Sequence, residues 1–247
     1  MTAGFQALTD SGFIQVDSEI GMPNWQLRSK LTQATVSSSF QIYYNNVGIT
    51  KSINAPMTTF TFAAVSPLVA FACDNGAYIC PLKWTPNGNV WTVDVVANAA
   101  CNITAYVFDQ ADQTATANNF GAQIFNSAGK CVADVTVPFA RFIDQRTANL
   151  QFANGATGWY SGGGQEPPKG IFGAWGYGVS QIAVACVRPA YMYSSALNGV
   201  YMSLFNTTGG SITGSFASLG SVGGDNNYVG FMEALQWGFA AIDVSNY

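Results

Sequence analysis

The chain has 247 residues, of which 49% are apolar and only 9% are charged. Its net charge is −4, and its nine basic residues form no cluster, so the sequence predicts no binding to nucleic-acid phosphates. The chain contains no histidine, which excludes the Ser-His-Asp and Cys-His classes of enzyme. A surface so poor in charge is typical of a protein that packs against other proteins.

The beginning of the chain and its apolar stretches predict neither export nor membrane insertion. The first ten residues, MTAGFQALTD, lack the basic start and the apolar segment of a secretory signal. The longest charge-free apolar stretch lies between Lys51 and Asp74. Because it contains Pro56, Pro67 and several threonines, it favours strands over a membrane-spanning helix.

Strand-like runs recur along the chain, rich in valine, isoleucine, threonine and aromatic residues. They cover residues 40–44, 58–62, 90–95, 103–107, 182–187 and 199–205. Turn signals separate them: Asn75-Gly76, Asn87-Gly88, Asn198-Gly199 and Gly209-Gly210. Only residues 226–241 could hold a short helix. The sequence therefore predicts an all-β fold, a β-sandwich or barrel.

An internal sequence repeat suggests a tandem duplication. Residues 4–17 read GFQALTDSGFIQVD and residues 121–134 read GAQIFNSAGKCVAD, with four identities at an offset of 117 residues. Residues 68–73 and 182–186 resemble each other more loosely. We expect two β-sandwich-like domains, 1–117 and 118–247, in which each copy of the motif is a hairpin closed by a glycine turn. The alternative is chance similarity between two hairpins.

The shared motif, G-[FA]-Q-x-[LF]-x-x-x-G-x-[IC]-x-x-D, resembles the N-terminal hairpin of small tail-associated proteins of tailed bacteriophages. The resemblance implies a β-rich, non-enzymatic virion component of the tail tip or fibre, assembled in the host cytoplasm. Its partners would be other phage tail proteins and a host-surface protein or glycan. Such parts are usually symmetric oligomers, and a trimer suits a tail axis.

The five cysteines are expected to be reduced, because their number is odd and no export signal precedes them. Cys73 and Cys80 flank Asn75-Gly76, and in a two-residue hairpin they would point to opposite faces of the sheet. The sequence therefore predicts no disulfide between them. Without histidine or a Cys-x-x-Cys motif, it also predicts no zinc site, and nothing in it calls for a cofactor.

Aromatic residues near the Gly/Pro-rich segment 161–170 form the predicted contact site for a partner or receptor. They are Trp159, Tyr160, Phe172, Trp175 and Tyr177. We expect residues 154–178 to form an exposed loop that carries them. The alternative interpretation is that they pack onto their own domain.

Two rival functions remain open. The first is a carbohydrate-binding module or adhesin that uses these aromatic residues. The second is a β-rich glycan hydrolase, which needs only two carboxylates. Asp109 and Asp112 are the closest acidic pair in an expected loop, where the simpler interpretation is a solvated turn.

Overall fold

The computed structural model describes residues 6–8, 14–17, 25–44, 49–109, 121–129, 131–150, 170–194, 199–221, 231–234 and 236–247. These residues form strands and turns and no helix, which confirms the all-β prediction. Within residues 226–241, where a short helix was the only candidate, the structure has β18 (Phe231–Ala234) and the start of β19 (Gln236–Asp243).

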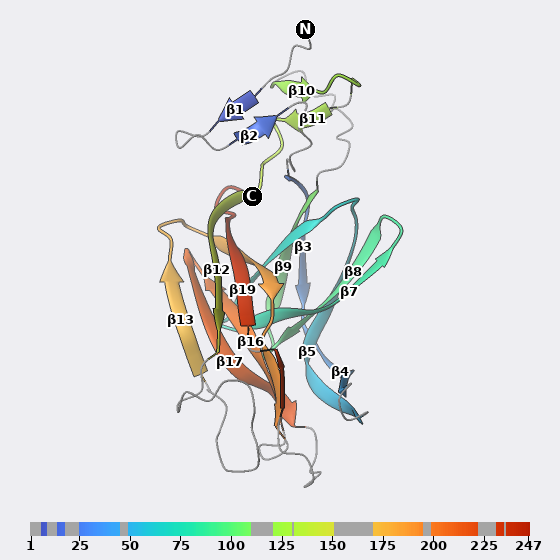
Figure 1. Ribbon diagram of the computed structural model, residues 1–247, viewed down its shortest axis with the longest axis vertical. Helices are drawn as coiled ribbons and strands as arrows, with labels where there is room; N and C mark the ends of the chain where they lie inside the picture. The colour runs from blue at the N-terminus through green and yellow to red at the C-terminus, as the bar shows by residue number, and fades with distance from the viewer. Residues whose placement is uncertain are drawn as a thin grey trace.

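The body of the molecule consists of two large sheets, drawn in Figure 1 below two small hairpins that are described with the functional site. The first sheet has six strands in the order β12–β19–β14–β6–β9–β3. Besides β19, its strands are β12 (Arg141–Asn149), β14 (Ile182–Arg188), β6 (Leu68–Cys73), β9 (Asn102–Asp109) and β3 (Gln26–Ala34).

The second sheet has nine strands, seven of them in the order β13–β17–β16–β7–β8–β5–β4. These are β13 (Gly170–Gly176), β17 (Ser211–Ser221), β16 (Gly199–Thr208), β7 (Ile79–Asn87), β8 (Val90–Ala97), β5 (Ile49–Ala63) and β4 (Val36–Tyr44). In addition, β15 (Tyr191–Ser194) pairs with β16 and β18. Two of the predicted turns close hairpins in this sheet, Gly88 between β7 and β8 and Gly209-Gly210 between β16 and β17.

The strand order of the six-stranded sheet is mirrored about its centre. In the six-stranded sheet, β12–β19–β14 from the second half of the chain meets β6–β9–β3 from the first half. The two halves join where Phe71 of β6 pairs with Val184 of β14, and where Ile79 of β7 pairs with Phe205 of β16. We call this junction the seam. The division into domains 1–117 and 118–247 stays a prediction, but both sheets run across it.

Each half has an aromatic core between the two sheets. In the first half, Phe60 of β5 and Phe71 of β6 have ring centroids 5.9 Å apart. In the second half, the rings of Phe205 of β16 and Phe239 of β19 are 5.1 Å apart. All four side chains are fully buried. Since burying one such ring stabilises the fold by about 1.5–3 kcal/mol, these contacts hold the two sheets together.

The six-stranded sheet also buries its opposite face, because it curls into a half-barrel. Its edge strands meet at their first residues, where the backbone N–H of Leu27 donates to Pro138 and that of Ala140 donates to Trp25, both at 2.8 Å. Small side chains line the enclosed face around larger ones such as Tyr106. The small residues are Ala70, Ala72, Ala183, Ala185 and Ala240.

The predicted hairpin between Cys73 and Cys80 is wrong. The turn itself forms: Asn75 and Gly76 both have positive φ, and the N–H of Ala77 donates to the carbonyl of Asp74. However, β6 belongs to the six-stranded sheet and β7 to the nine-stranded sheet. The chain crosses between sheets here because residues of both strands, including Phe71 and Ile79, pack into the core between them.

Candidate functional site

Three of the five predicted contact residues lie against their own body. Phe172 and Trp175, on edge strand β13, are partly buried, and their ring centroids are 4.7 and 5.6 Å from that of Trp237. Tyr177 follows the strand and packs on the same core. This is the arrangement expected if the aromatic group packs onto its own domain. Trp159 and Tyr160 lie outside the described residues, and contact with another chain stays a prediction.

Part of the predicted loop 154–178 is a strand, since residues 170–176 form β13. Two glycines make room for its aromatic rings. A Cβ atom on Gly173 would lie 2.2 Å from the ring of Trp175, and one on Gly214 would lie 2.4 Å from the ring of Phe172. Gly173 and Gly214 therefore serve close packing within a sheet, while Gly162, Gly163 and Gly164, which suggested a loop, lie outside the described residues.

Tyr177 connects this core to a surface ion pair. Its hydroxyl donates to Asp144 at 2.9 Å, and Arg146 Nε contacts the same carboxylate oxygen at 2.6 Å. Burial opposes ionisation of Asp144, but the bonds from Tyr177 and Arg146 outweigh it and lower the pKa of Asp144. Burial and the bond to Asp144 raise the pKa of Tyr177 to about 12. The cluster therefore joins β12, at the edge of one sheet, to the residue that follows β13, at the edge of the other.

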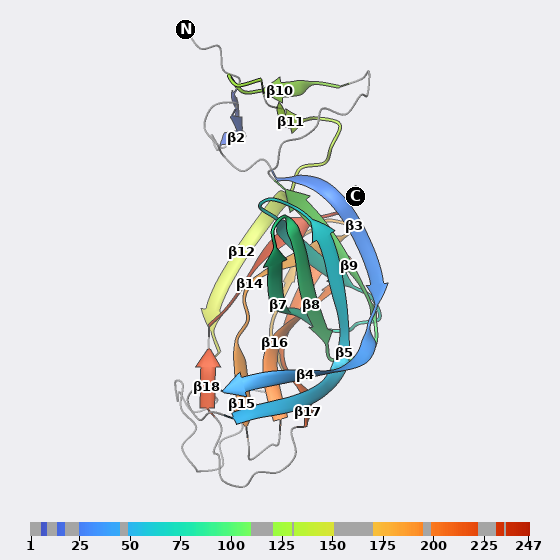
Figure 2. The same ribbon diagram turned by 90° about the vertical axis from the view of Figure 1, so that its right-hand side faces the viewer.

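Two small hairpins lie at one end of the molecule, beyond the large sheets (Figures 1 and 2). They are β1 (Gln6–Leu8) with β2 (Ile14–Asp17), and β10 (Gln123–Phe125) with β11 (Cys131–Asp134). We call them the hairpin end. Both have the same pairing at an offset of 117 residues, including a register shift at the same place. The repeat seen in the sequence is thus a repeat of backbone structure.

The second hairpin explains why the four identical residues recur. Gly121 has φ +128°, and a Cβ atom there would lie 2.5 Å from Thr136 Cγ2. Gln123 Nε2 donates to Asp134 Oδ2 across the hairpin at 2.9 Å. Gly129 closes the turn with φ +75°. Two of the residues supply backbone conformations that favour glycine, and the other two form a cross-strand bond.

Gln26, at the start of β3, ties the second hairpin to the body. Its Nε2 donates to the carbonyls of Asp134 at 2.5 Å and Val137 at 3.0 Å. Its Oε1 accepts the backbone N–H of Asp134 at 3.1 Å. The side chain is fully buried, so these bonds satisfy its polar atoms away from water. No local pattern around Gln26 pointed to this role, because its contacts span more than 100 residues.

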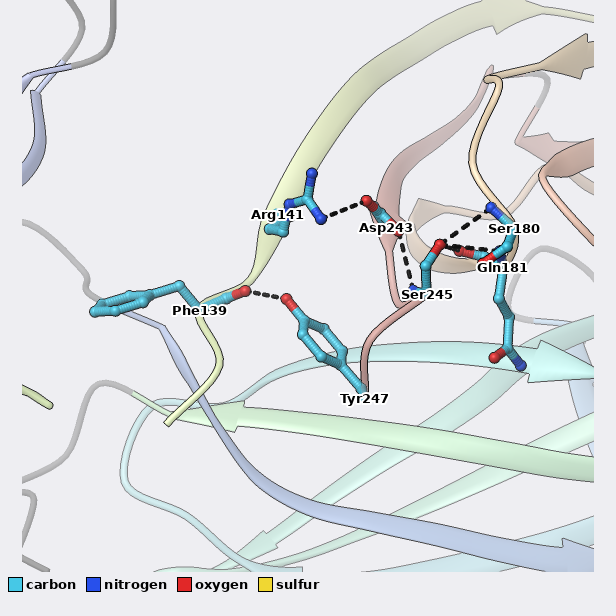
Figure 3. Close-up of polar contacts among 7 residues, drawn as sticks. All are labelled: Phe139, Arg141, Ser180, Gln181, Asp243, Ser245 and Tyr247. Carbon is cyan, nitrogen blue, oxygen red and sulfur yellow. Dashed lines mark hydrogen bonds and ion pairs between the residues drawn. The ribbon is translucent and has the colours of Figure 1, made fainter. Parts of the chain in front are cut away.

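The end of β19 and the residues after it contact the start of β12 (Figure 3). The hydroxyl of Tyr247 donates to the carbonyl of Phe139, next to the start of β12. Arg141 Nη1 lies 2.8 Å from Asp243 Oδ2. Burial opposes ionisation of Asp243, but bonds from Ser245 and the charge of Arg141 lower its pKa.

Corresponding turns in the two halves are held by different side chains. The carboxylate of Asp109 accepts the N–H groups of Val65–Ser66, both at 2.9 Å. The hydroxyl of Ser245 accepts those of Ser180–Gln181, both at 3.1 Å (Figure 3). The expectation that Asp109 lies in a solvated turn is therefore wrong, since it is buried and bound to backbone. Asp112 lies outside the described residues.

A groove of about 690 Å³ opens near the seam, with walls from both halves. Its lining includes Phe40, Met57, Leu82, Val200 and Met202, with Lys83 and Asp94 among its polar residues. Aliphatic side chains predominate over the stacked aromatic rings that usually hold sugars. This groove therefore adds no support to the carbohydrate-binding alternative.

Within the described ranges, no three His, Cys, Asp or Glu side chains come together as metal ligands. No helix in these ranges could cross a membrane. All five cysteines are free, and Cys80 and Cys186 are neighbours, with sulfurs 3.9 Å apart. Burial raises the pKa of Cys101 to about 11, which keeps this thiol protonated at neutral pH.

No family model matches the chain, and no curated protein or solved structure is significantly similar to it. Function must therefore be inferred from the residues and their arrangement.

Proposed function

We propose that this chain is a non-enzymatic structural subunit of a phage tail tip or tail fibre. It joins other virion proteins through the hairpin end and works as a homo-oligomer, with a trimer as the expected state. The observation that carries the proposal is the repeated hairpin, presented twice with one register at one end of the molecule.

Exposed apolar side chains on the second hairpin support this assignment. Phe125 of β10 is 47% exposed, and Val135, which follows β11, is 54% exposed. Large apolar side chains exposed to water are typical anchors for a partner surface. The low charge of the whole chain fits the same interpretation, because little repulsion opposes the association of copies or partners.

Contact with a host-surface protein or glycan is the finer part of the proposal. It would use the five predicted contact residues: Trp159 and Tyr160 together with Phe172, Trp175 and Tyr177. These three rings already support the body, so they would act as the base of the contact rather than as free anchors.

Immunogold electron microscopy of phage particles whose genome carries this gene tests the assignment. An antibody against the chain should label the tail end of purified particles. Particles that lack the protein, or that carry it only on the head, would contradict the proposal.

Substitution at the hairpin end tests the assembly surface. Phe125→Asp and Val135→Asp should each weaken association at least tenfold, measured by analytical ultracentrifugation and by incorporation into particles. Ile171→Asp is the matched control, because Ile171 is 66% exposed and lies on β13, away from the hairpins. Equal loss in all three variants would show that association depends on general apolarity rather than on this end.

A further inference from the structure

Two thiols from opposite halves of the chain meet at the seam. Cys80 lies on β7 and Cys186 lies on β14, and their sulfur atoms are 3.9 Å apart. Cys80 is fully buried, whereas Cys186 is partly exposed. They are 106 residues apart in the sequence, so only the joining of the two halves brings them together.

We propose that Cys80 and Cys186 form a site of oxidative cross-linking that locks the two halves together across the seam. A disulfide needs its sulfurs about 2 Å apart, so side-chain rotation and a small backbone shift must close the remaining gap. This site is independent of the proposed role in a phage tail.

The chemistry requires an oxidant, and a small-molecule disulfide of the glutathione class supplies it. The thiolate of Cys186 attacks one sulfur of this disulfide, forming a mixed disulfide and releasing one small thiolate. Cys80 then loses its proton and attacks the Cys186 sulfur, which releases the second small thiolate. Both thiolates take up the protons lost by the cysteines, so the protein pair is oxidised and the small disulfide is reduced to two thiols.

The exposure of the pair favours this order of attack. The partly exposed Cys186 can meet the oxidant in solvent, while Cys80 lies buried directly beside it and can resolve the mixed disulfide. The hydrogen bond with Cys186 and burial raise the pKa of Cys80, so Cys80 stays protonated until Cys186 has reacted with the oxidant.

A matched comparison exists in the first half of the chain. Cys73 and Cys186 each lie two residues after the pair Phe71–Val184 that joins the halves, and both are partly exposed. However, the thiol of Cys73 donates to the carbonyl of Ala77 at 3.0 Å. Cys73 therefore has a similar position and exposure, but its sulfur contacts Ala77 and Thr207 rather than a second thiol.

Oxidised glutathione added to the reduced full-length protein tests the proposal, with intact and peptide mass spectrometry as the readout. Wild type and Cys73→Ser should lose two hydrogens and give a peptide that joins Cys80 to Cys186. Cys186→Ser should form no such link, and Cys80→Ala should keep glutathione on Cys186. The cross-linked protein should melt about 10 °C higher than the reduced one, because a long loop is closed in the unfolded chain.

Three results would overturn the proposal. The first is a wild-type protein that still has five free thiols after oxidation. The second is a wild-type protein that keeps glutathione on Cys186 without forming the link. The third is a disulfide that uses any other cysteine. All three are measured on the wild-type chain, so they do not depend on whether a variant folds.

Discussion

The two halves of the body hold corresponding turns with different side chains. In the first half, the carboxylate of Asp109 holds the two N–H groups of Val65–Ser66 before β6. In the second half, the hydroxyl of Ser245 holds those of Ser180–Gln181 before β14. The backbone arrangement of the two turns is shared, while the side chains that hold them are not.

Corresponding positions inside the half-barrel also carry different side chains. Tyr106 of β9 pairs with Ala70, and Ile242 of β19 pairs with Ala183 in the corresponding place. Both side chains are fully buried. Of the two, only Tyr106 carries a polar atom, and its hydroxyl has no hydrogen-bond partner among the described residues. At this position the first half therefore loses stability to a buried hydroxyl without a partner, whereas the second half has no polar atom there.

The largest difference is expected at the two turns. Asp109→Ala should lower the free energy of unfolding by about 3 kcal/mol, because two backbone N–H groups lose their bonds to a buried carboxylate. Ser245→Ala should lower it by only about 1 kcal/mol, since it removes bonds to a neutral and more exposed group. Urea unfolding of both variants measures this, and equal losses would show that the two turns are energetically equivalent.

Gln26 tests how the second hairpin is held to the body. Gln26→Ala should cost about 2 kcal/mol, because it leaves the backbone of Asp134 without its buried partner. Amide hydrogen exchange should become faster in β10–β11 and stay unchanged in β7–β8, which serves as the internal control. Unchanged exchange in β10–β11 would show that the second hairpin is held by other contacts.

Tyr106→Phe should make the first half more like the second. Removing a buried hydroxyl that has no partner should leave stability unchanged or raise it by up to about 1 kcal/mol. Tyr201→Phe is a comparison at a nearly buried tyrosine of the second half. Thermal unfolding measures both, and a clear loss of stability in Tyr106→Phe would reveal a partner for this hydroxyl.

The smallest effect is expected from titration of Tyr177. Its pKa is raised to about 12 in the folded protein, so its neutral form is favoured by folding. This contribution is complete below the ordinary tyrosine pKa of about 10 and is lost as pH rises toward 12. Tyr177→Phe should flatten the decline in stability over this range, measured by urea unfolding at several pH values. An unchanged decline would assign it to other groups.

Local patterns predicted local structure well. Strand-like runs became strands, and Gly88 and Gly209-Gly210 close hairpins as expected, because alternation and positive φ are properties of a few adjacent residues. The repeat of Gly, Gln, Gly and Asp predicted two hairpins with one register. The same kind of evidence failed at Asn75-Gly76, where the turn formed but its flanking strands entered different sheets.

The sequence by itself determined the all-β class and the repeated hairpin. Only the tertiary structure decided that both sheets run across the two halves, that Phe172 and Trp175 pack around Trp237, and that Cys186 meets Cys80. The physical reason is the range of the interactions. A turn depends on neighbouring residues, whereas the partner of a strand depends on which apolar faces are buried together, and here those faces come from residues more than 100 positions apart.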